Sequence, residues 1–253
     1  MIQDKTRYES EPGLGSEEGK ALAVMAHDIK APLSAIVSIL GVIEKGYVED
    51  IDKAKELVSR AKKKAETLIS MVDDILDYTL LKDKSMKKRE KVHLFDILKD
   101  SIDTMKPYAD ERKIIFMYDP SLCKGKIING NYTFLLRAFN NIIMNAVKND
   151  KKNGKITIDC SQDKKKHTVT ITVSDTGRGI PEEELGKVFH FFERGKQTRR
   201  NIDGSLGLGL ALVKQIIEDH EGKIELTSTV GVGTTVIVTL PFLLEKKGGT
   251  NES

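Results

Sequence analysis

Two asparagines and a lysine in one apolar segment have a spacing that could do chemistry. Asn141 and Asn145 are four residues apart, so a helix would place them on one face, and Lys148 follows three residues later. An amide oxygen is a hard ligand suited to Mg²⁺, and a lysine ammonium supplies a point charge for phosphate. Taken singly, these asparagines could equally cap the helix or face solvent.

A carboxylate followed by two glycines forms a second candidate. Asp175 stands at the end of an expected strand, and Gly177 and Gly179 follow it at two-residue steps. Glycines allow a backbone to come close to a ligand, and the carboxylate could accept a hydrogen bond from an exocyclic amine. A plain strand-to-turn connection explains the same motif about as well.

Two more glycine clusters follow. Residues 204–210 open an apolar helix, where free N–H groups and the helix dipole favour phosphate. This cluster lacks the Lys-Ser or Lys-Thr that ends a Walker loop, and it opens no dinucleotide-binding unit. The cluster 231–234, as a lone feature, indicates a hairpin turn.

His27 is the histidine whose placement suggests reactivity. In a helix it points about 160–200° away from Met25 and Ile29, hence away from the apolar stripe. An imidazole in solvent offers an unprotonated nitrogen near neutral pH, although a lone surface histidine is most often only solvated. No motif demands an imidazole at the other histidines, which are His93, His167, His190 and His220.

Two amphipathic helices are expected to carry His27. From Ser16, apolar residues recur at three- and four-residue steps until Gly46, and after a short turn a second pattern repeats for about four heptads. The first set is Leu22, Met25, Ile29, Leu33, Ile36, Leu40 and Ile43; the second is Ile51, Ala54, Val58, Ala61, Ala65, Leu68, Val72, Ile75 and Thr79. An antiparallel hairpin results, and its wide apolar face predicts a homodimeric four-helix bundle. The alternative is a monomeric hairpin covered by the downstream domain.

Downstream, helices and strands come in blocks rather than in strict alternation. A helix is expected over residues 131–149, a hairpin of strands over 155–159 and 167–174, and a helix ending at His220 followed by strands over 223–228 and 234–240. This order predicts an α+β sandwich with a mixed sheet.

Composition excludes several classes of protein. The chain has 253 residues, 39% hydrophobic and 31% charged, which argues against global disorder, a collagen-like fibre and a disulfide-stapled miniprotein. A net charge of +3 gives no sign of a nucleic-acid partner. Cys123 and Cys160 lie far apart in the chain without metal-ligand spacing, and they suit a reducing compartment.

The chain shows no expected membrane span. The longest apolar run, near residues 35–43, is interrupted by Ser38 and Gly41 and is too short to cross a bilayer. The polar first residues lack the apolar centre of a signal peptide. A soluble intracellular protein is the expectation.

In order along the chain, these motifs resemble the N, G1, F, G2 and G3 boxes of sensor histidine kinases. They are Asn145-Ala-Val-Lys148, Asp175-x-Gly-x-Gly-Ile, Phe189-x-x-Phe192-x-Arg194, Gly207-Leu-Gly-Leu-Ala and Gly231-x-Gly-Thr. Upstream, His27-Asp-Ile-Lys-Ala-Pro-Leu33 resembles their H box. The resemblance covers residues from about 17 to 243. Gyrase, heat-shock chaperone and mismatch-repair relatives share the ATP-binding fold but lack the H and F boxes.

The resemblance implies a fold and a division into domains. The fold is α+β: an antiparallel helical hairpin forming a dimeric four-helix bundle, then an α/β sandwich of the Bergerat ATPase type. Residues 1–16 would be a leader or linker stub, 17–85 the dimerisation and phosphotransfer domain, 90–243 the catalytic ATP-binding domain, and 244–253 a disordered tail. Since no sensor domain fits in the remainder, the protein would be cytoplasmic or the cytoplasmic portion of a longer membrane-bound sensor.

The resemblance also implies roles. His27 would attack the γ-phosphate of ATP, Asp28 would orient it and accept its proton, and Arg194 would stabilise the developing charge. Asp175 would bind the adenine amine, and Asn145 would hold Mg²⁺. The remaining nucleotide-binding residues would be Asn141, Lys148, Gly177, Gly179, Gly207, Leu208, Gly209 and Thr234, with residues 194–205 as the ATP lid. The phosphate would pass from His27 to an aspartate of a response regulator.

Three parts of the sequence depart from the family pattern. Asn149 replaces an aromatic residue, which predicts modest affinity for the base, and Ser205-Leu206 alters the glycine box of the lid. Ala31 stands where relatives carry Thr or Asn and cannot position a water, so phosphatase activity is expected to be weak. A non-catalytic dimeric scaffold and a different ATPase of the same superfold are the rival interpretations.

Overall fold

The computed structural model describes residues 17–82, 88–190 and 208–244. These residues belong to two compact units, with the division after Ile75. Several predicted features lie outside the described residues: the leader 1–16, Phe192, Arg194, the lid 194–205, Leu206, Gly207 and the tail from 245.

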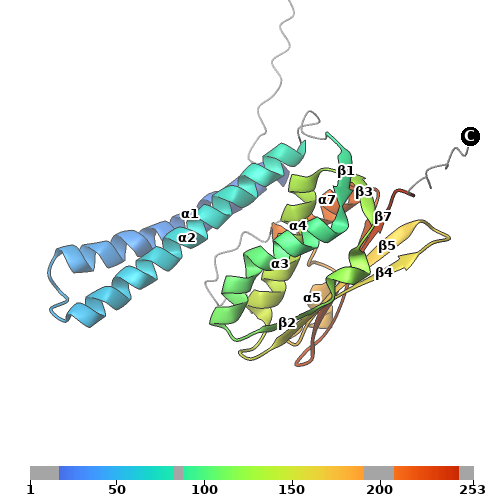
Figure 1. The fold of residues 1–253 in the computed structure, drawn as a ribbon. Coiled ribbons are helices and arrows are strands. Elements are labelled where there is room, and N and C mark those ends of the chain that lie inside the picture. The colour runs from blue at the N-terminus through green and yellow to red at the C-terminus, as the bar shows by residue number, and fades with distance from the viewer. Residues whose placement is uncertain (1–16, 83–87, 191–207, 245–253) are drawn as a thin grey trace, which may run out of the picture. The chain divides into compact units, whose positions relative to one another are not determined.

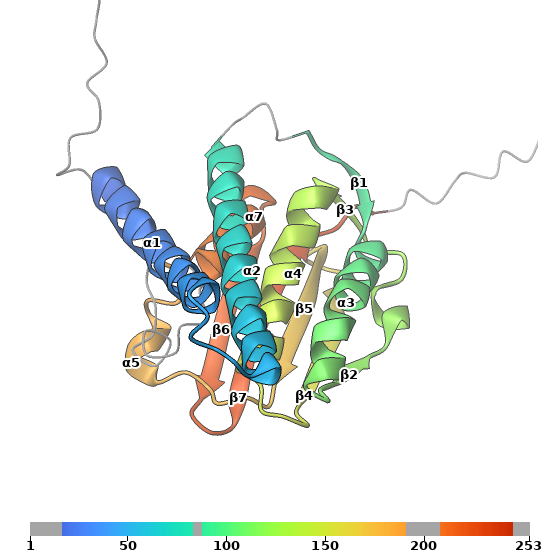
Figure 2. The same cartoon turned by 90° about the vertical axis from the view of Figure 1, so that its left-hand side faces the viewer.

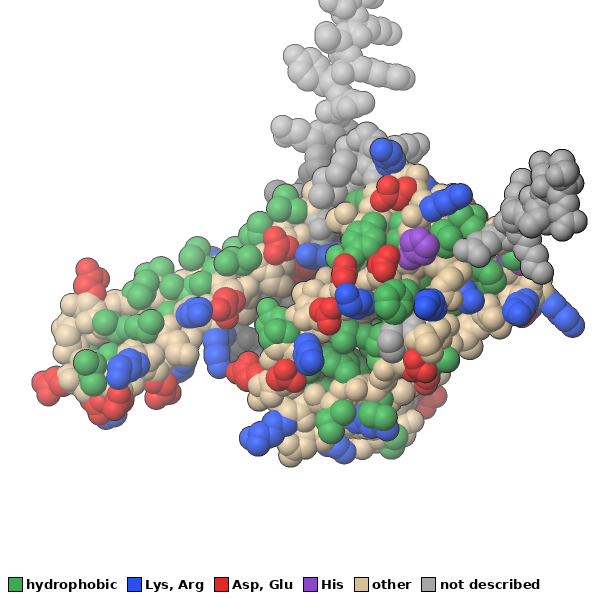
Figure 3. Space-filling model, viewed as in Figure 1, with side chains coloured by type: hydrophobic (Ala, Val, Ile, Leu, Met, Phe, Trp, Pro, Cys, Tyr) green, Lys and Arg blue, Asp and Glu red, His purple; other side chains and the backbone are tan. Residues whose placement is uncertain are grey.

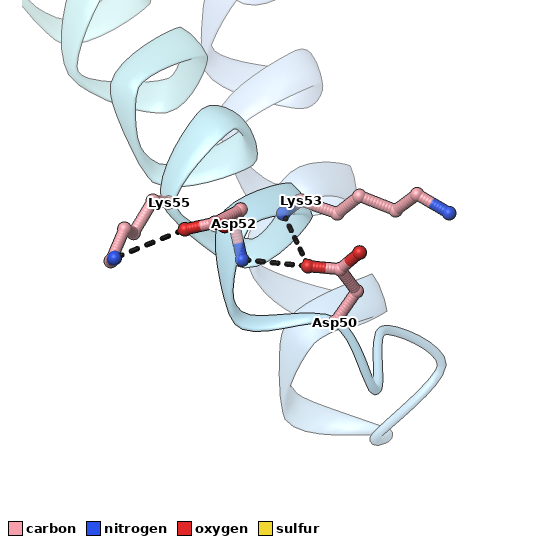
Figure 4. Close-up of polar contacts among 4 residues, drawn as sticks. All are labelled: Asp50, Asp52, Lys53 and Lys55. Atoms are coloured by element: carbon pink, nitrogen blue, oxygen red, sulfur yellow. Dashed lines mark hydrogen bonds and ion pairs between the residues drawn. The ribbon is translucent and has the colours of Figure 1, made fainter.

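The first unit is a helical hairpin. Helices α1 (Glu17–Glu44) and α2 (Ile51–Lys82) run side by side in opposite directions (Figure 1). Gly46 has a φ of +69° in the turn after α1, so a glycine ends this helix as predicted. At the start of α2, Asp50 Oδ1 accepts hydrogen bonds from the backbone N–H groups of Asp52 (2.8 Å) and Lys53 (3.3 Å), as Figure 4 shows.

The apolar seam of this hairpin lies open in the single chain. Ile51, Val58 and Val72 on α2 are 71%, 53% and 49% exposed, and on α1 Leu40 is 50% exposed. Figure 3 shows hydrophobic side chains at the surface along both helices. Hydrophobic residues in a heptad pattern are normally buried against a partner, so the hairpin has an uncovered face.

One stretch of α1 contradicts the expectation that no segment could span a membrane. Met25–Glu44 is 20 residues long with a mean hydropathy of 1.4, and its window is 6% buried. The Ile, Val, Leu and Ala residues of this stretch keep the mean hydropathy high although Ser38 and Gly41 interrupt the apolar run. Length and composition alone are weak evidence for a span, because a helix that packs against a partner passes the same test.

The second unit contains a mixed five-stranded sheet, as predicted. Its order is β2 (Ile115–Tyr118), β4 (Lys155–Asp163), β5 (Thr168–Asp175), β7 (Gly233–Pro241), β6 (Lys223–Thr229). β2 pairs with β4 in parallel, and the other pairs are antiparallel. A separate two-stranded sheet joins β1 (Glu90–His93) to β3 (Ile127–Gly130), and the sequence analysis did not predict β3.

Three helices cover one face of the five-stranded sheet (Figure 2). They are α3 (Leu94–Glu111), α4 (Tyr132–Asn149) and α7 (Gly209–Asp219); η2 (Pro120–Cys123) and α5 (Glu182–Leu185) are short. Alternate strand residues such as Ile158 and Ile171 are buried with Phe139 in the core between the layers. The opposite sheet face is rich in hydroxyls, with Ser174 Oγ 2.9 Å from Thr235 Oγ1.

The two cysteines correct another expectation. Cys123 in η2 and Cys160 in β4 form a disulfide, with Cα atoms 5.7 Å apart, although 37 residues separate them in the chain. β2 pairs with β4, and η2 follows β2 directly, so the fold brings the two side chains together. Sequence distance alone gave the wrong prediction of two separate thiols.

Candidate functional site

The carboxylate of Asp175 is held at the end of β5. Its Oδ1 accepts hydrogen bonds from the backbone N–H groups of Gly177 (2.8 Å) and Thr234 (3.1 Å). Burial raises the pKa of Asp175; these two hydrogen bonds lower it, and the nearby Asp150 charge raises it further. Among the described residues, no hydrogen bond reaches Oδ2, so this oxygen is free to accept one from a ligand.

Glycines allow the segments around Asp175 to touch backbone to backbone. A Cβ at Gly177 would collide with the carbonyl oxygen of Asn149, and one at Gly233 with the carbonyl oxygen of Asp175. Gly179 has a φ of +71° and meets the carbonyl of Thr229 in the same way. The two predicted binding glycines therefore shape the site by close packing of the chain on itself.

Ser228 joins these segments, and the sequence analysis missed it. Its Oγ accepts a hydrogen bond from Ile180 N–H (2.8 Å), donates one to the Gly233 carbonyl (2.9 Å), and lies 2.9 Å from Thr234 Oγ1. Thr234 N–H in turn binds Asp175. A serine on a short strand carries no spacing signal, so only the tertiary contacts identify its role.

The predicted amide helix is α4, and several polar atoms of its asparagines lack hydrogen-bond partners among the described residues. Asn141 Nδ2 is buried without a hydrogen bond, as is Oδ1 of Asn140. In the part of the chain that the structure describes, the half-buried Asn145 side chain makes no hydrogen bond and the exposed Lys148 ammonium makes no ion pair. Unpaired buried amides are costly, so this face of α4 fits a polar ligand.

The start of α7 lies beside α4. The Cβ position of Gly209 is 3.9 Å from Asn141 Oδ1, and the capping residue Leu208 makes no side-chain hydrogen bond to the helix. The first N–H groups of α7 are therefore not capped by this residue, and with the helix dipole they favour an anion. The structure thus brings together Asn141, Leu208 and Gly209, three of the residues that the resemblance assigns to nucleotide binding.

Asn149 links the two sides of the site. Its Nδ2 donates to the Asn145 carbonyl (2.8 Å), and its Oδ1 accepts from Arg178 Nη2 (2.6 Å). The Arg178 carbonyl accepts from Gly231 N–H (2.8 Å). Asn149, which stands where the resemblance predicts an aromatic residue, therefore connects the end of α4 to the loop that contains Gly177 and Gly179.

His27 lies on α1 in the other unit. Its side chain is 83% exposed, and Nδ1 is 3.3 Å from Oδ1 of Asp28, which is 19% exposed. The exposure agrees with the predicted position away from the apolar stripe. Nδ1 faces the carboxylate of Asp28. The other ring nitrogen, Nε2, has no partner among the described residues.

His220, by contrast, is a buried structural histidine, whereas the sequence analysis treated it as a solvated residue outside any motif. It is 5% exposed, its Nε2 accepts a hydrogen bond from Asn131 N–H (3.0 Å), and its Nδ1 lies 2.7 Å from the Ile216 carbonyl. These contacts fix the neutral ring between α7 and the start of α4.

The donor set suits a nucleotide better than a protein-bound metal centre. The described residues contain no group of three or more His, Cys, Asp or Glu side chains that could hold a metal ion. Amides, a lysine, uncapped helix N–H groups and one carboxylate instead match the phosphates and amino group of a nucleotide. A cation at this site would need phosphate oxygens as additional ligands.

Two protein families match the chain. Residues 17–84 match the His Kinase A (phospho-acceptor) domain. Residues 130–244 match the family described as Histidine kinase-, DNA gyrase B-, and HSP90-like ATPase. The two matches contain both sets of residues described above.

Individual relatives are longer proteins. Drug sensory protein A of Synechocystis sp. is 29% identical over 246 residues, which are 92% of this chain and 36% of that protein. Sensor protein kinase WalK of Staphylococcus aureus is 27% identical over 246 residues, 93% of this chain and 56% of that protein. The chain therefore spans about a third to a half of the lengths of these relatives.

A solved structure shares the fold. Histidine kinase ThkA, in complex with response regulator protein TrrA, matches with a TM-score of 0.70 and 22% identity. The match covers 90% of this chain and 63% of that chain. The hairpin and α/β domain described above therefore recur in a solved protein.

Proposed function

Because the chain belongs to the sensor histidine kinases of two-component systems, we propose that it phosphorylates its own His27 from ATP and passes the phosphate to a response regulator. The observation that carries this proposal is the exposed His27 imidazole, with Nδ1 facing the Asp28 carboxylate. We assign residues 17–85 to phosphotransfer and 90–243 to ATP binding.

The imidazole geometry defines the nucleophile. Asp28 Oδ1, 3.3 Å from Nδ1, favours the tautomer with the proton on Nδ1 and the lone pair on Nε2. Nε2 then attacks the γ-phosphorus, the bond from phosphorus to the β–γ bridging oxygen breaks, and ADP leaves. Asp28 takes the Nδ1 proton, so the product is a neutral imidazole carrying phosphate on Nε2.

The nucleotide would bind between α4, the start of α7 and the Asp175 loop. Asp175 Oδ2 would accept a hydrogen bond from the adenine amine, since Oδ1 is already bonded to Gly177 and Thr234. Asn141, Lys148 and the N–H groups after Leu208 would contact the phosphates. Arg194 and Gly207, which lie outside the described residues, would complete the phosphate contacts.

Asn145 would hold Mg²⁺. Its side-chain oxygen is a hard donor that makes no hydrogen bond among the described residues, and the orphaned Asn141 amide lies one turn away. When bound, Mg²⁺ neutralises charge on the transferred phosphate. Asn145 fixes where that charge compensation occurs, because α4 is anchored in the core by Ile142 and Ala146.

A second copy would cover the apolar face of the hairpin. Exposed seam residues on both helices, including Leu40 and Val58, support a homodimeric four-helix bundle. The response regulator would dock on the same domain, because its aspartate must reach His27. We place this core on the cytoplasmic side of a longer sensor, where ATP is available.

Radiolabelling tests the proposal. The purified chain is incubated with γ-labelled ATP and Mg²⁺, and the label is examined in acid and alkali. We expect acid-labile, alkali-stable label that is absent from His27→Gln and retained in His93→Gln, whose exposed ring lies in no motif. Free phosphate without protein label would indicate another ATPase; neither product would indicate a non-catalytic scaffold.

A further inference from the structure

A buried carboxylate lies directly behind the adenine-recognising loop. Asp150 follows the last residue of α4 and is 3% exposed. Its Oδ1 accepts hydrogen bonds from Lys151 N–H (2.8 Å) and from the hydroxyl of Thr176 (3.0 Å). Thr176 is the residue between Asp175 and Gly177, so this bond joins α4 to the nucleotide loop.

Thr176 is itself held from a second side. Its Oγ1 accepts a hydrogen bond from Lys155 N–H (3.0 Å) at the start of β4 and donates to Asp150. One hydroxyl therefore connects the loop, the sheet and the helix. A threonine that both accepts and donates has its orientation fixed, and the peptide carrying Asp175 is fixed with it.

Burying this carboxylate costs free energy that a neutral side chain in the same contact would not cost. Asp150 Oδ2 is buried without any hydrogen-bond partner among the described residues, and a Cβ at Gly154 would collide with this side chain. A neutral acceptor would hold Thr176 without leaving a buried charged oxygen unpaired. The negative charge instead acts on Asp175, whose pKa it helps to raise.

The end of α4 that carries Asp150 is anchored independently. Arg112 donates to the carbonyl oxygens of Lys148 (2.9 Å) and Asp150 (2.6 Å), which fixes the last turn of the helix. Movement of the Asp175 loop relative to Asn145 and Lys148 is therefore limited by the bond between Asp150 and Thr176.

We propose that Asp150 is a positioning residue that, through the Thr176 hydroxyl, holds the adenine-recognising carboxylate in register with the phosphate-binding face of α4. The inference rests on the proposed function, because it assumes that Asp175 receives the adenine amine. Loss of the hydrogen bond between Thr176 and Asp150 should weaken recognition of the adenine base and leave contacts to the phosphates intact.

The test compares ATP with GTP. Guanine presents a carbonyl where adenine presents its amine, so Asp175 contributes to binding of ATP and not of GTP. Titration calorimetry with the full chain and each magnesium nucleotide gives a ratio of affinities. We expect Thr176→Val to lower that ratio roughly tenfold, since small misplacements of a polar group have effects of this order. GTP affinity should stay within about twofold.

Two variants control for structural damage. Thr176→Ser restores the hydroxyl and should return the ATP-to-GTP ratio to within about twofold of wild type. Thr172→Val makes the same chemical change on β5, the strand that leads into this loop, at a side chain without a described hydrogen bond to another side chain, and should leave the ratio unchanged. Asp150→Ala should reproduce the effect of Thr176→Val.

The outcomes separate this inference from the proposed function. If wild type prefers ATP and labels His27, but Thr176→Val keeps the same ratio, the inference is wrong and the function stands. Equal losses for ATP and GTP in Thr176→Val, or failure of serine to restore the ratio, would also overturn it. If wild type shows no preference for ATP, adenine recognition by Asp175 is wrong and the inference falls with it.

Discussion

The helical hairpin exposes many of its large apolar side chains, whereas the α/β unit buries most of its own. The hairpin leaves Ile51 and Val58 more than half exposed, whereas the α/β unit buries Phe139, Leu98 and Ile171 completely. An α/β sandwich closes its own core between helices and sheet, while two helices cannot enclose one. We therefore expect the first unit to depend on a partner for stability and the second to be stable without one.

The two regions also build their chemistry differently. His27 and Asp28 are neighbours in the chain, and one helical turn is enough to place them. Asp175 is held by Thr234, which is 59 residues away, and its loop is tied to Asp150 on another element. The proposed phosphoacceptor site is thus local in sequence, whereas the proposed nucleotide site requires the assembled fold.

The largest expected effect lies in the α/β unit. Asp175→Asn places an amide where the adenine amine needs an acceptor, and ATP affinity should fall roughly a hundredfold or more. Calorimetry measures the loss, and Asp159→Asn, an exposed change on β4 of the same sheet, should bind ATP normally. Unchanged affinity in Asp175→Asn would remove this residue from the site.

Disrupting the hairpin should affect assembly and spare nucleotide binding. Val58→Asp puts a charge into the seam that we expect a second copy to cover, which destabilises the dimer by several kcal/mol. Sedimentation should show a monomer at micromolar concentration, while Ser59→Asp, next to it and also exposed, should remain dimeric. If the wild-type protein sediments as a monomer, the hairpin does not need a second copy to cover its apolar face, and this contrast between the two units is wrong.

Acid should weaken ATP binding through the α/β unit. The pKa of Asp175 is raised, chiefly by burial, and its proton removes the charge that accepts the adenine amine. ATP affinity should be constant above that pKa and fall up to about tenfold per pH unit below it. In Asp150→Asn the negative charge that helps to raise the pKa of Asp175 is absent, so ATP affinity should begin to fall at a lower pH. Calorimetry across the acidic range measures both curves; identical curves would contradict the coupling.

The smallest expected effect concerns the hairpin. Ala31 is exposed one helical turn beyond His27 and can offer no hydrogen bond to a water. Ala31→Thr should speed dephosphorylation of the regulator by roughly tenfold, the lower end of the effect of one positioned hydrogen bond. Autophosphorylation should change much less. A time course of phospho-regulator decay with ADP distinguishes the variants, and equal decay rates would show that water positioning does not limit the reaction.

Local patterns were sufficient for most elements and for the residue types of the site. The three- and four-residue apolar spacing predicted both hairpin helices, and Asn131 begins α4 as its capping residue, accepting from Phe134 N–H at 3.2 Å. Alternation predicted β5, and the exposure of His27 followed from its angle to Met25. Strand β3 was missed because its sequence, Ile-Ile-Asn-Gly, shows no apolar–polar alternation and ends in residues typical of turns.

Contacts between distant segments could be obtained only from the tertiary structure. The pairing of β2 with β4 decides that Cys123 meets Cys160, and the approach of β6 and β7 to the Asp175 loop decides that Ser228 becomes a hydrogen-bonding centre. Asp150 carries no signal in the sequence, and only the fold brings the Thr176 hydroxyl to its carboxylate. The sequence by itself determined which residues could do chemistry, because periodicity and motif order are local properties. Only the folded chain decided how they are held, because burial and hydrogen-bond partners depend on which strands and helices meet.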